Sequence, residues 1–341
     1  MSYLRVAVVG LGYFSQFHLG SWAGMQGVDL IGVTDLDPDL TRETADRLGV
    51  TAYARIQAIL DDDPDIIDLV VPPSAHANLI RACLKPGRTL ICQKPFCLSL
   101  AEAEQITAEA ETARTTLVIH ENFRFQPWHR QVKAFLDAGR MGQVYNARFA
   151  LRPGDGRGAQ AYLARQPTFQ QMPRFLVQET AVHFIDTFRW LFGPITAVYA
   201  DLRQLNPVIK GEDAGTLLLR HETGAQSVFD GNRLSDHVAE NPRMTMGEMD
   251  IEGEAGTLSL DGFGRLSFRG FGAQSGDPVP ITAPVDASQF GGGCVDALNR
   301  HVVAALAQGH APENTARDYL DVIRVCEAAY LSHAEGRRIA L

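Results

Sequence analysis

Five apolar runs in the first 125 residues, separated by segments of helical character, constrain the fold more than any other feature. The runs lie at 4–10, 28–35, 65–73, 88–95 and 115–125, and helical segments lie at 37–50, 74–87 and 99–114. Short continuous apolar runs are typical of strands that are buried on both faces. Their regular alternation with helices predicts a parallel, doubly wound sheet of the Rossmann type.

From about residue 121 the pattern changes. Segments such as 144–151 and 214–222 alternate apolar and polar residues between Gly, Asn and Asp turns, which is typical of strands with one buried face. Two helical segments, at 294–309 and 316–336, end the sequence. We therefore expect an α/β chain with a dinucleotide-binding domain at 1–120 and an α+β substrate-binding domain at 121–341.

The composition narrows the class of protein. The chain has 341 residues, of which 45% are hydrophobic, and this is enough for two cores. A net charge of -9 with scattered basic residues argues against nucleic acid or an anionic membrane as a partner. No apolar run is long enough to span a bilayer, and a strand at residue 4 leaves no room for a signal peptide. Since the five cysteines show neither metal spacing nor even pairing, we expect a cytoplasmic protein.

A glycine-rich turn follows the first strand. Gly10 and Gly12 belong to an incomplete GxGxxG pattern with Ser15 at its third position. Such a turn lets the backbone approach a dinucleotide pyrophosphate, which sits at the positive end of the next helix. Asp35 ends the second strand, where a carboxylate binds the adenosine ribose and repels a 2′-phosphate. The pattern predicts NAD rather than NADP; the alternative is an empty turn with Asp35 as a helix cap.

Lys94 stands at the tip of the apolar run 88–95, directly before Pro95. Ligands of open α/β sheets bind outside the carboxyl ends of the strands, so we expect Lys94 to face the cofactor crevice. An ammonium group there can stabilise a developing alkoxide and share in proton transfer. The alternative is a structural lysine that extends its charge to solvent from a strand end.

Glu179 and His183 are four residues apart and are expected to share a helix face. A carboxylate beside an imidazole can hold its tautomer and stabilise the imidazolium after proton uptake. Taken alone, such a pair is more often a solvated ion pair or a capped core histidine than a catalytic pair. Zinc would need a third ligand and a His-Glu-x-x-His pattern, which the sequence lacks, so we expect no metal.

Three of these segments resemble the glucose-fructose oxidoreductase/inositol dehydrogenase family, called Gfo/Idh/MocA. Gln93-Lys94-Pro95 corresponds to its Glu-Lys-Pro signature, with Gln in place of Glu. "VVPPSAH" resembles its Thr-Pro-Asn-x-x-His turn and keeps Pro72 and His76. "QETAVHFID" resembles its Asp-x-Gly-x-His-x-x-Asp motif, with Glu and Ala in place of Asp and Gly.

The resemblance implies an NAD-dependent dehydrogenase that oxidises a hydroxyl group of a sugar or polyol. It implies that Lys94 binds the substrate hydroxyl, that His183 takes its proton and that Glu179 orients the imidazole; which of Lys94 and His183 is the primary base stays open. Because Gln93 stands in place of the family's Glu, this chain lacks a fixed carboxylate directly before Lys94. The expected cofactor-binding residues are Gly10, Gly12, Tyr13, Phe14, Asp35, Pro72, His76, Gln93, Lys94 and Asn122. The expected substrate-binding residues are Lys94, Asn122, Arg124, Arg165, Arg174, Glu179 and His183.

The resemblance also implies an open, mostly antiparallel sheet in the second domain, with one face on helices and the other covered by a second subunit of a homodimer or homotetramer. Segments 93–104, 120–128 and 177–186 most resemble the branch that contains D-apiose dehydrogenase, which implies oxidation of the anomeric carbon of a pentose to a lactone.

Three alternatives remain. Some family members are glycoside hydrolases that use NAD to oxidise a sugar transiently. The presence of Lys94 and His183 argues against a non-catalytic dinucleotide sensor, and Asp35 argues against an NADP-linked reductase.

Overall fold

The chain passes from one compact unit to another after Glu121. In the computed structural model, which describes residues 3–341, the first unit comprises Met1–Glu121 and Val295–Asp321. The second comprises Asn122–Cys294 and Val322–Leu341. From the sequence we expected a boundary after residue 120 and all later residues in the second domain, whereas the structure packs 295–321 with the first unit.

Specific polar contacts hold that returning segment, which contains most of α9 (Cys294–Ala307) and the start of α10 (Ala316–Glu335). Ser21 donates a hydrogen bond to Asp296 (2.9 Å) and accepts one from Asn299 (3.2 Å). The Asn314 side chain donates to the carbonyl of Glu121 (2.6 Å). These contacts join residues almost two hundred or more positions apart, so no local pattern in the sequence indicates them.

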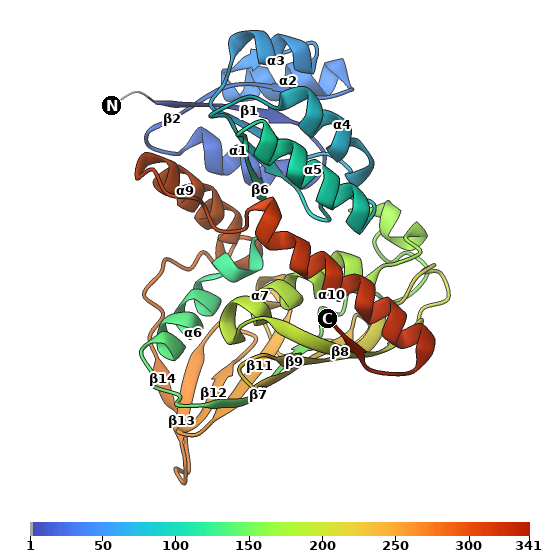
Figure 1. The fold of residues 1–341 in the computed structure, drawn as a ribbon, viewed down its shortest axis with the longest axis vertical. Coiled ribbons are helices and arrows are strands. Elements are labelled where there is room, and N and C mark those ends of the chain that lie inside the picture. Colours follow the sequence, from blue (N-terminus) through green and yellow to red (C-terminus); the bar gives the residue numbers. More distant parts are fainter. Residues whose placement is uncertain (1–2) are drawn as a thin grey trace. The chain divides into compact units, whose positions relative to one another are not determined.

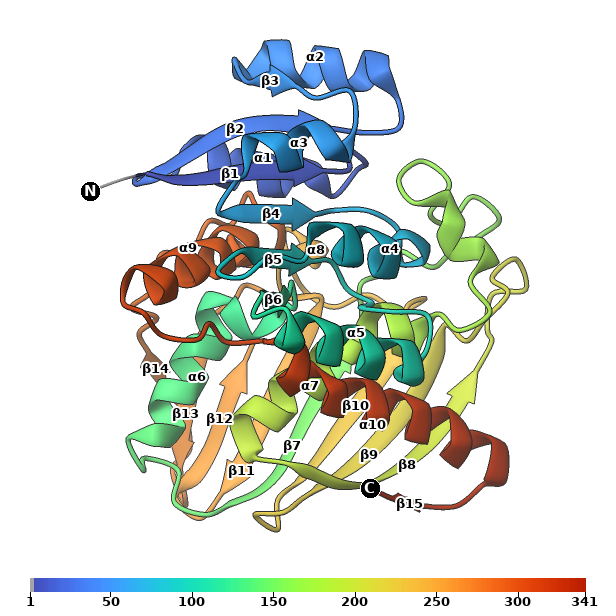
Figure 2. The ribbon, with the colours of Figure 1, turned by 45° about the horizontal axis from the view of Figure 1, so that its top comes forward.

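Six parallel strands form the sheet of the first unit (Figure 2). They lie in the order β3-β2-β1-β4-β5-β6, which confirms the Rossmann sheet. Every residue of β4 and β5 is buried, as expected for strands covered on both faces. The strands are β1 (Leu4–Val9), β2 (Val28–Thr34), β3 (Thr51–Ala52), β4 (Ile66–Leu69), β5 (Thr89–Cys92) and β6 (Thr116–Ile119).

Side chains cap two of the five helices that alternate with these strands. Asp37 caps α2 by accepting from the backbone of Asp39 and Leu40, and Ser99 caps α5 by accepting from Glu102. No described side chain caps α1. The helices are α1 (Ser15–Ala23), α2 (Pro38–Leu48), α3 (Ile56–Asp62), α4 (Pro73–Cys83) and α5 (Leu100–Thr112).

A nine-stranded sheet forms the second unit, in the order β14-β13-β12-β11-β7-β10-β9-β8-β15. Every neighbouring pair is antiparallel except β7 and β10, which confirms a mostly antiparallel sheet. The strands are β7 (Val144–Leu151), β8 (Ile195–Arg203), β9 (Ala214–His221), β10 (Gln226–Asn232), β11 (Gly247–Gly253), β12 (Gly256–Leu260), β13 (Leu266–Gly270), β14 (Asp277–Val279) and β15 (Ile339–Ala340).

One face of this sheet carries helices and the other is open (Figure 1). On the covered face, Phe184 of α7 (Val182–Phe192) stacks on Phe149 at 3.8 Å between ring centroids and packs near Phe229. On the open face, Tyr199 and Leu218 are exposed. The remaining helical segments of the unit are α6 (Pro127–Asp137), α8 (Pro242–Thr245), η1 (Phe123–Phe125), η2 (Pro167–Gln171), η3 (Leu176–Ala181), η4 (Phe290–Gly292) and the rest of α10.

Among the described helices, none combines the length and the apolar character that crossing a membrane requires.

Candidate active site

The two glycines of the β1–α1 turn are needed for different reasons. Gly10 has a φ of +94°, and a Cβ atom on it would lie 2.3 Å from the carbonyl oxygen of Val70. Close packing of the backbone therefore requires glycine at this position. A Cβ atom on Gly12 would meet no described atom within 4 Å. Packing within the protein does not require glycine there, whereas close approach of a ligand does.

The N-terminus of α1 fits a phosphate group. Phe14 occupies the N-cap position, no described side chain caps the helix, and its first turn carries no acidic residue. The Ser15 hydroxyl donates to the carbonyl of Gly12 (2.7 Å), which ties the turn to the helix. Backbone N–H groups and the helix dipole make such an end a site for anions. The turn and helix together fit the pyrophosphate of a dinucleotide.

Asp35 joins the glycine turn to the loop after β2. Its Oδ2 accepts from the backbone N–H of Leu11 (2.7 Å) and its Oδ1 from that of Asp37 (3.0 Å). A carboxylate has about four acceptor positions, so this partly exposed group retains capacity for a ribose diol. Because Asp37 is the cap of α2, the alternative interpretation of Asp35 as the helix cap is wrong.

His76 holds the loop that follows Lys94. Its Nδ1 lies 2.8 Å from the carbonyl oxygen of Phe96, and its Nε2 lies 2.9 Å from that of Val71. Burial lowers the pKa of His76, and the neutral ring donates to one of the two carbonyls at a time. Pro72 is the N-cap of α4, one turn before this ring. His76 thus links the end of β4 to the segment after β5.

Lys94 is half-buried just beyond the carboxyl end of β5, where the sequence analysis expected it. In an open α/β sheet this edge is where ligands bind. The predicted cofactor residues of the first unit all lie in turns or helix starts at the carboxyl ends of β1, β2, β4 and β5: Gly10, Gly12, Tyr13, Phe14, Asp35, Pro72, His76, Gln93 and Lys94.

In the second unit, His183 lies in the first turn of α7 and is almost fully buried. Its ring stacks on Phe123 of η1 with 3.9 Å between centroids and 5° between planes, which fixes the orientation of the imidazole. Asn122 directly precedes this phenylalanine. Its Oδ1 is buried, and no group among residues 3–341 donates to it, as expected of an acceptor kept for a ligand.

Glu179 does not occupy the α-helical face that its spacing predicts. It lies in a π-helical segment, η3 (Leu176–Ala181), which precedes α7. The backbone N–H of Val182 reaches the carbonyl of Val177, five residues back. This wider turn changes the angle between Glu179 and His183, so the expectation of a shared α-helical face is wrong. Single π-helical turns occur frequently at functional sites.

A buried arginine holds Glu179. Arg233 follows β10, is 1% exposed, and donates from Nη1 to Glu179 Oε2 at 2.9 Å. It also donates to Asp155 Oδ2 (2.9 Å) and to the Tyr162 hydroxyl (2.8 Å). Burial alone would lower the pKa of the Arg233 guanidinium, but Asp155, Tyr162 and Glu179 raise it above its ordinary value. Glu179 is therefore held as a carboxylate.

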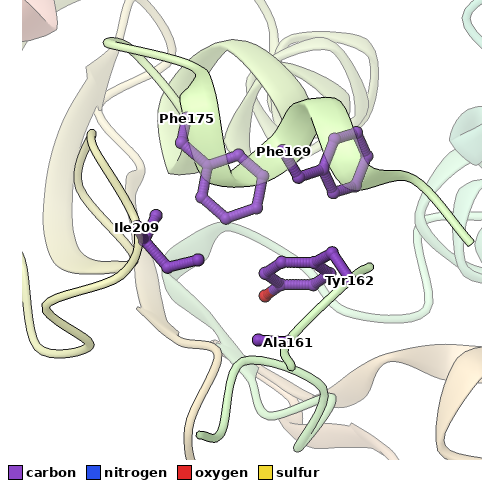
Figure 3. Packing of buried hydrophobic residues seen from close by; sticks show 5 residues of the cluster. All are labelled: Ala161, Tyr162, Phe169, Phe175 and Ile209. Carbon is purple, nitrogen blue, oxygen red and sulfur yellow. The ribbon is translucent and has the colours of Figure 1, made fainter. Parts of the chain in front are cut away.

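An aromatic cluster packs around this cation. Figure 3 shows the rings of Tyr162, Phe169 and Phe175 together, with Ile209 and Ala161 beside them. The guanidinium carbon of Arg233 lies 5.1 Å from the Tyr162 centroid and 4.8 Å from the Phe175 centroid. These cation–π contacts fix the loop between β7 and η3 onto Arg233.

The three predicted substrate-binding arginines all have carboxylate partners. Arg124 forms a two-point ion pair with Asp186, and both side chains are buried. Arg174 donates to both oxygens of Glu327 (2.7 and 2.9 Å). Arg165 lies 3.3 Å from Asp155. Each of the three arginines therefore pairs with a carboxylate of the protein. Their binding to a substrate remains a prediction.

Sequence reasoning missed Arg233, Phe123, His18 and Asp68. Arg233 stands directly after a strand, where nothing local distinguishes it from a solvated arginine. Phe123 lies in segment 120–128, which the sequence analysis uses only for its family resemblance, and its stacking on His183 joins residues 60 positions apart. The sequence does offer one signal for Asp68, since an aspartate within the otherwise apolar segment of β4 needs a buried partner.

The comparisons with known proteins agree with this geometry. The family model for the Gfo/Idh/MocA oxidoreductases with an NAD-binding Rossmann fold matches residues 4–121, and that for the Gfo/Idh/MocA C-terminal domain matches residues 129–259. The chain is 33% identical to a D-apiose dehydrogenase of Paraburkholderia graminis, covering 98% of this chain and 89% of the relative. It is 30% identical to one of Rhizobium rhizogenes, covering 99% and 98%.

A solved structure shows the same fold. It is that of an Agrobacterium radiobacter oxidoreductase in complex with NAD+, L-tartaric acid and magnesium. The TM-score is 0.89 at 28% identity, and the match covers 99% of this chain and 98% of that one.

Two alanine substitutions separate packing from cofactor binding in the glycine turn. We expect Gly10→Ala to destabilise the first unit by about 1–3 kcal/mol, because of its strained φ and the contact with Val70. Gly12→Ala should change stability by less than about 0.5 kcal/mol but weaken NAD binding roughly tenfold or more. Urea unfolding and calorimetric titration measure the two effects. Wild-type affinity in Gly12→Ala would contradict the assignment.

Arg233→Met removes the buried cation that pairs with Asp155 and Glu179. We expect a loss of about 3–5 kcal/mol, because Asp155 and Glu179 lose a buried counter-charge. Arg165→Met, at a side chain that is 22% exposed, is the control and should cost less than about 1 kcal/mol. Urea unfolding of the second unit provides the measurement, and equal losses in the two variants would show that Arg233 has no special role.

Proposed function

Because the chain belongs to the Gfo/Idh/MocA family of NAD-binding oxidoreductases, we propose that it is an NAD-dependent sugar dehydrogenase that oxidises the anomeric carbon of D-apiose to a lactone. The observation that carries this proposal is the similarity to two D-apiose dehydrogenases over nearly the whole chain. Lys94 and His183 are both present at the positions that the family resemblance assigns to chemistry.

The first unit fits the cofactor. The open space at Gly12, the uncapped α1 and the carboxylate of Asp35 would hold the pyrophosphate and the ribose. When it is bound, NAD supplies the acceptor for the two electrons and the hydrogen that leave the oxidised carbon. The charge of Asp35 disfavours a 2′-phosphate and hence NADP.

Lys94 would bind the reacting oxygen. An ammonium group at the carboxyl edge of the sheet can donate to the sugar hydroxyl. As the hydroxyl proton leaves, the oxygen gains negative charge, and the cation stabilises this charge more than the neutral hydroxyl. Lys94 therefore lowers the barrier to oxidation.

His183 would accept the hydroxyl proton. Its neutral imidazole has one nitrogen with a lone pair, and stacking on Phe123 keeps the ring in one plane. Glu179, which Arg233 holds as a carboxylate, contributes negative charge to the same helical motif. This charge favours the imidazolium that forms on proton uptake.

A second copy of the chain would cover the open sheet face. Tyr199 and Leu218 are cross-strand neighbours, 41% and 40% exposed, and Val228 continues the apolar row on β10. Solvent-exposed apolar rows of this kind are typical of interaction surfaces. We also infer a location in the cytoplasm, a reducing compartment in which the five cysteines of the chain would stay reduced.

The direct test of function is NADH formation from a panel of aldoses and polyols that includes D-apiose, with NADP as the cofactor control. The proposal predicts NADH with D-apiose and NAD, and little product with NADP. NADH formed only from another sugar would reject the apiose assignment and keep the reaction class. Release of sugar from glycosides without net NADH would favour the hydrolase alternative.

Lys94→Met should lower kcat by roughly two to four orders of magnitude while NAD still binds, because the developing alkoxide loses its cation. Lys85→Met, which removes an exposed lysine paired with Asp63, is the matched control and should keep its activity. Steady-state kinetics and cofactor titration check both variants. Near-normal turnover of Lys94→Met would remove its catalytic role.

His183→Asn should remove the acidic limb of the pH–rate profile. The base must be neutral, so wild-type kcat/KM falls as pH falls and the imidazole takes up a proton. Asparagine has no titrating group in this range, and turnover should drop by roughly two to four orders of magnitude. A profile measured from pH about 5 to 9 checks this, and an unchanged acidic limb in the variant would identify a different base.

Leu218→Arg should yield monomers in light scattering, because it places a charge in the proposed interface. Leu331→Arg, at a leucine of α10 that is 45% exposed, is the control and should leave the assembly unchanged. The same mass for Leu218→Arg and the unmodified protein would exclude this face as the interface.

A further inference from the structure

A buried polar network lies inside the first unit and reaches Gln93, the residue before Lys94. His18 of α1 and Asp68 of β4 are both fully buried, with 2.7 Å between Nδ1 and Oδ2. The indole N–H of Trp22 donates to the same oxygen, also at 2.7 Å. Within residues 3–341, no group donates to the other oxygen of Asp68.

This carboxylate needs a counter-charge. A buried carboxylate with two N–H donors is poorly compensated for the loss of water unless one of the donors is charged. Trp22 is neutral, so His18 is the donor that can supply the charge. An imidazolium at position 18 would make a buried ion pair with Asp68.

The groups that surround His18 are consistent with this assignment. Phe14 lies at its edge, and the His120 ring lies 4.2 Å away between centroids. Burial raises the pKa of Cys92 far above its usual range, and Asp68 contributes to the same shift, so this thiol is neutral. Lys94 is adjacent in sequence to Gln93, which contacts the ring. Asp68 is thus the anion in contact with His18 among the described groups.

The contact of His18 with Gln93 depends on which way the carboxamide faces. The two Nε2 atoms are 2.7 Å apart, so the carboxamide of Gln93 is within hydrogen-bonding distance of the ring. The nitrogen and oxygen of a carboxamide are nearly interchangeable in shape, so the same position suits Oε1. With Oε1 facing the ring, His18 donates from both nitrogens, as only an imidazolium does.

We propose that the His18–Asp68 ion pair is a positioning device that turns the carbonyl of Gln93 inward and its amino group toward the carboxyl edge of the sheet. There the amino group donates to an acceptor on the ligand, such as the carboxamide oxygen of the nicotinamide. This role rests on the proposed function, because it gives Gln93 a task in holding the cofactor beside Lys94. A glutamate at position 93 would still accept from His18 but would have no donor for the ligand.

Histidine NMR tests whether His18 carries a charge, and the experiment does not depend on catalytic activity. In cofactor-free protein labelled with 15N-histidine, we expect both ring nitrogens of His18 to be protonated at about pH 8, with His18→Gln identifying the signal. His237, which is partly exposed, serves as the internal reference for a ring without a buried carboxylate partner. A neutral His18 with a proton on Nδ1 alone would overturn the proposal.

Cofactor titration tests the orientation of the Gln93 carboxamide, with variants that leave His18 and Asp68 unchanged. Gln93→Met and Gln93→Glu should each weaken NAD binding roughly tenfold, because both remove the amino donor. Wild-type affinity in Gln93→Glu would overturn the assigned donor. Both measurements are independent of the substrate panel, so a failure to find a sugar substrate does not affect them.

Discussion

The buried guanidinium of Arg233 is the constraint on which the part of the second unit around Glu179 depends. A guanidinium has five N–H donors and cannot lose its charge, so a site without water must supply acceptors for it. Asp155, Tyr162, Glu179 and Thr180 supply them. The loop between β7 and η3, the aromatic cluster and the π-helical turn all take positions that satisfy this one cation.

Each unit carries its own set of candidate residues. The parallel sheet ends at one edge in a glycine turn and a carboxylate, which fit a dinucleotide, and in Lys94, the proposed partner of the reacting oxygen. In the second unit, stacking on Phe123 fixes the ring plane of His183, the proposed base. The second unit uses a buried ion pair, Arg233 with Glu179, in a place where a side chain must hold one orientation. Such pairs cost desolvation, and they are expected where orientation matters more than stability.

The sequence predicts this structure wherever a signal is local. Short apolar runs, the Gly10–Gly12 turn and Asp35 at a strand end define the Rossmann sheet and its ligand edge, because period and spacing depend only on neighbours in the chain. The return of 295–321 to the first unit could not be predicted, since it depends on contacts such as Ser21 with Asp296. The π-helical turn depends on distant groups as well: the carboxylate of Glu212 accepts from the backbone of Phe175 and Val177.

The central claim is that the hydrogen on the anomeric carbon of the sugar passes to NAD, with Lys94 and His183 handling the oxygen and its proton. The most direct test uses D-apiose with deuterium at the anomeric carbon and mass spectrometry of both products. The account predicts reduced dinucleotide that carries the deuterium and an equal amount of lactone without it. Deuterium that remains on the sugar, or returns to it without accumulation of reduced dinucleotide, would contradict the account.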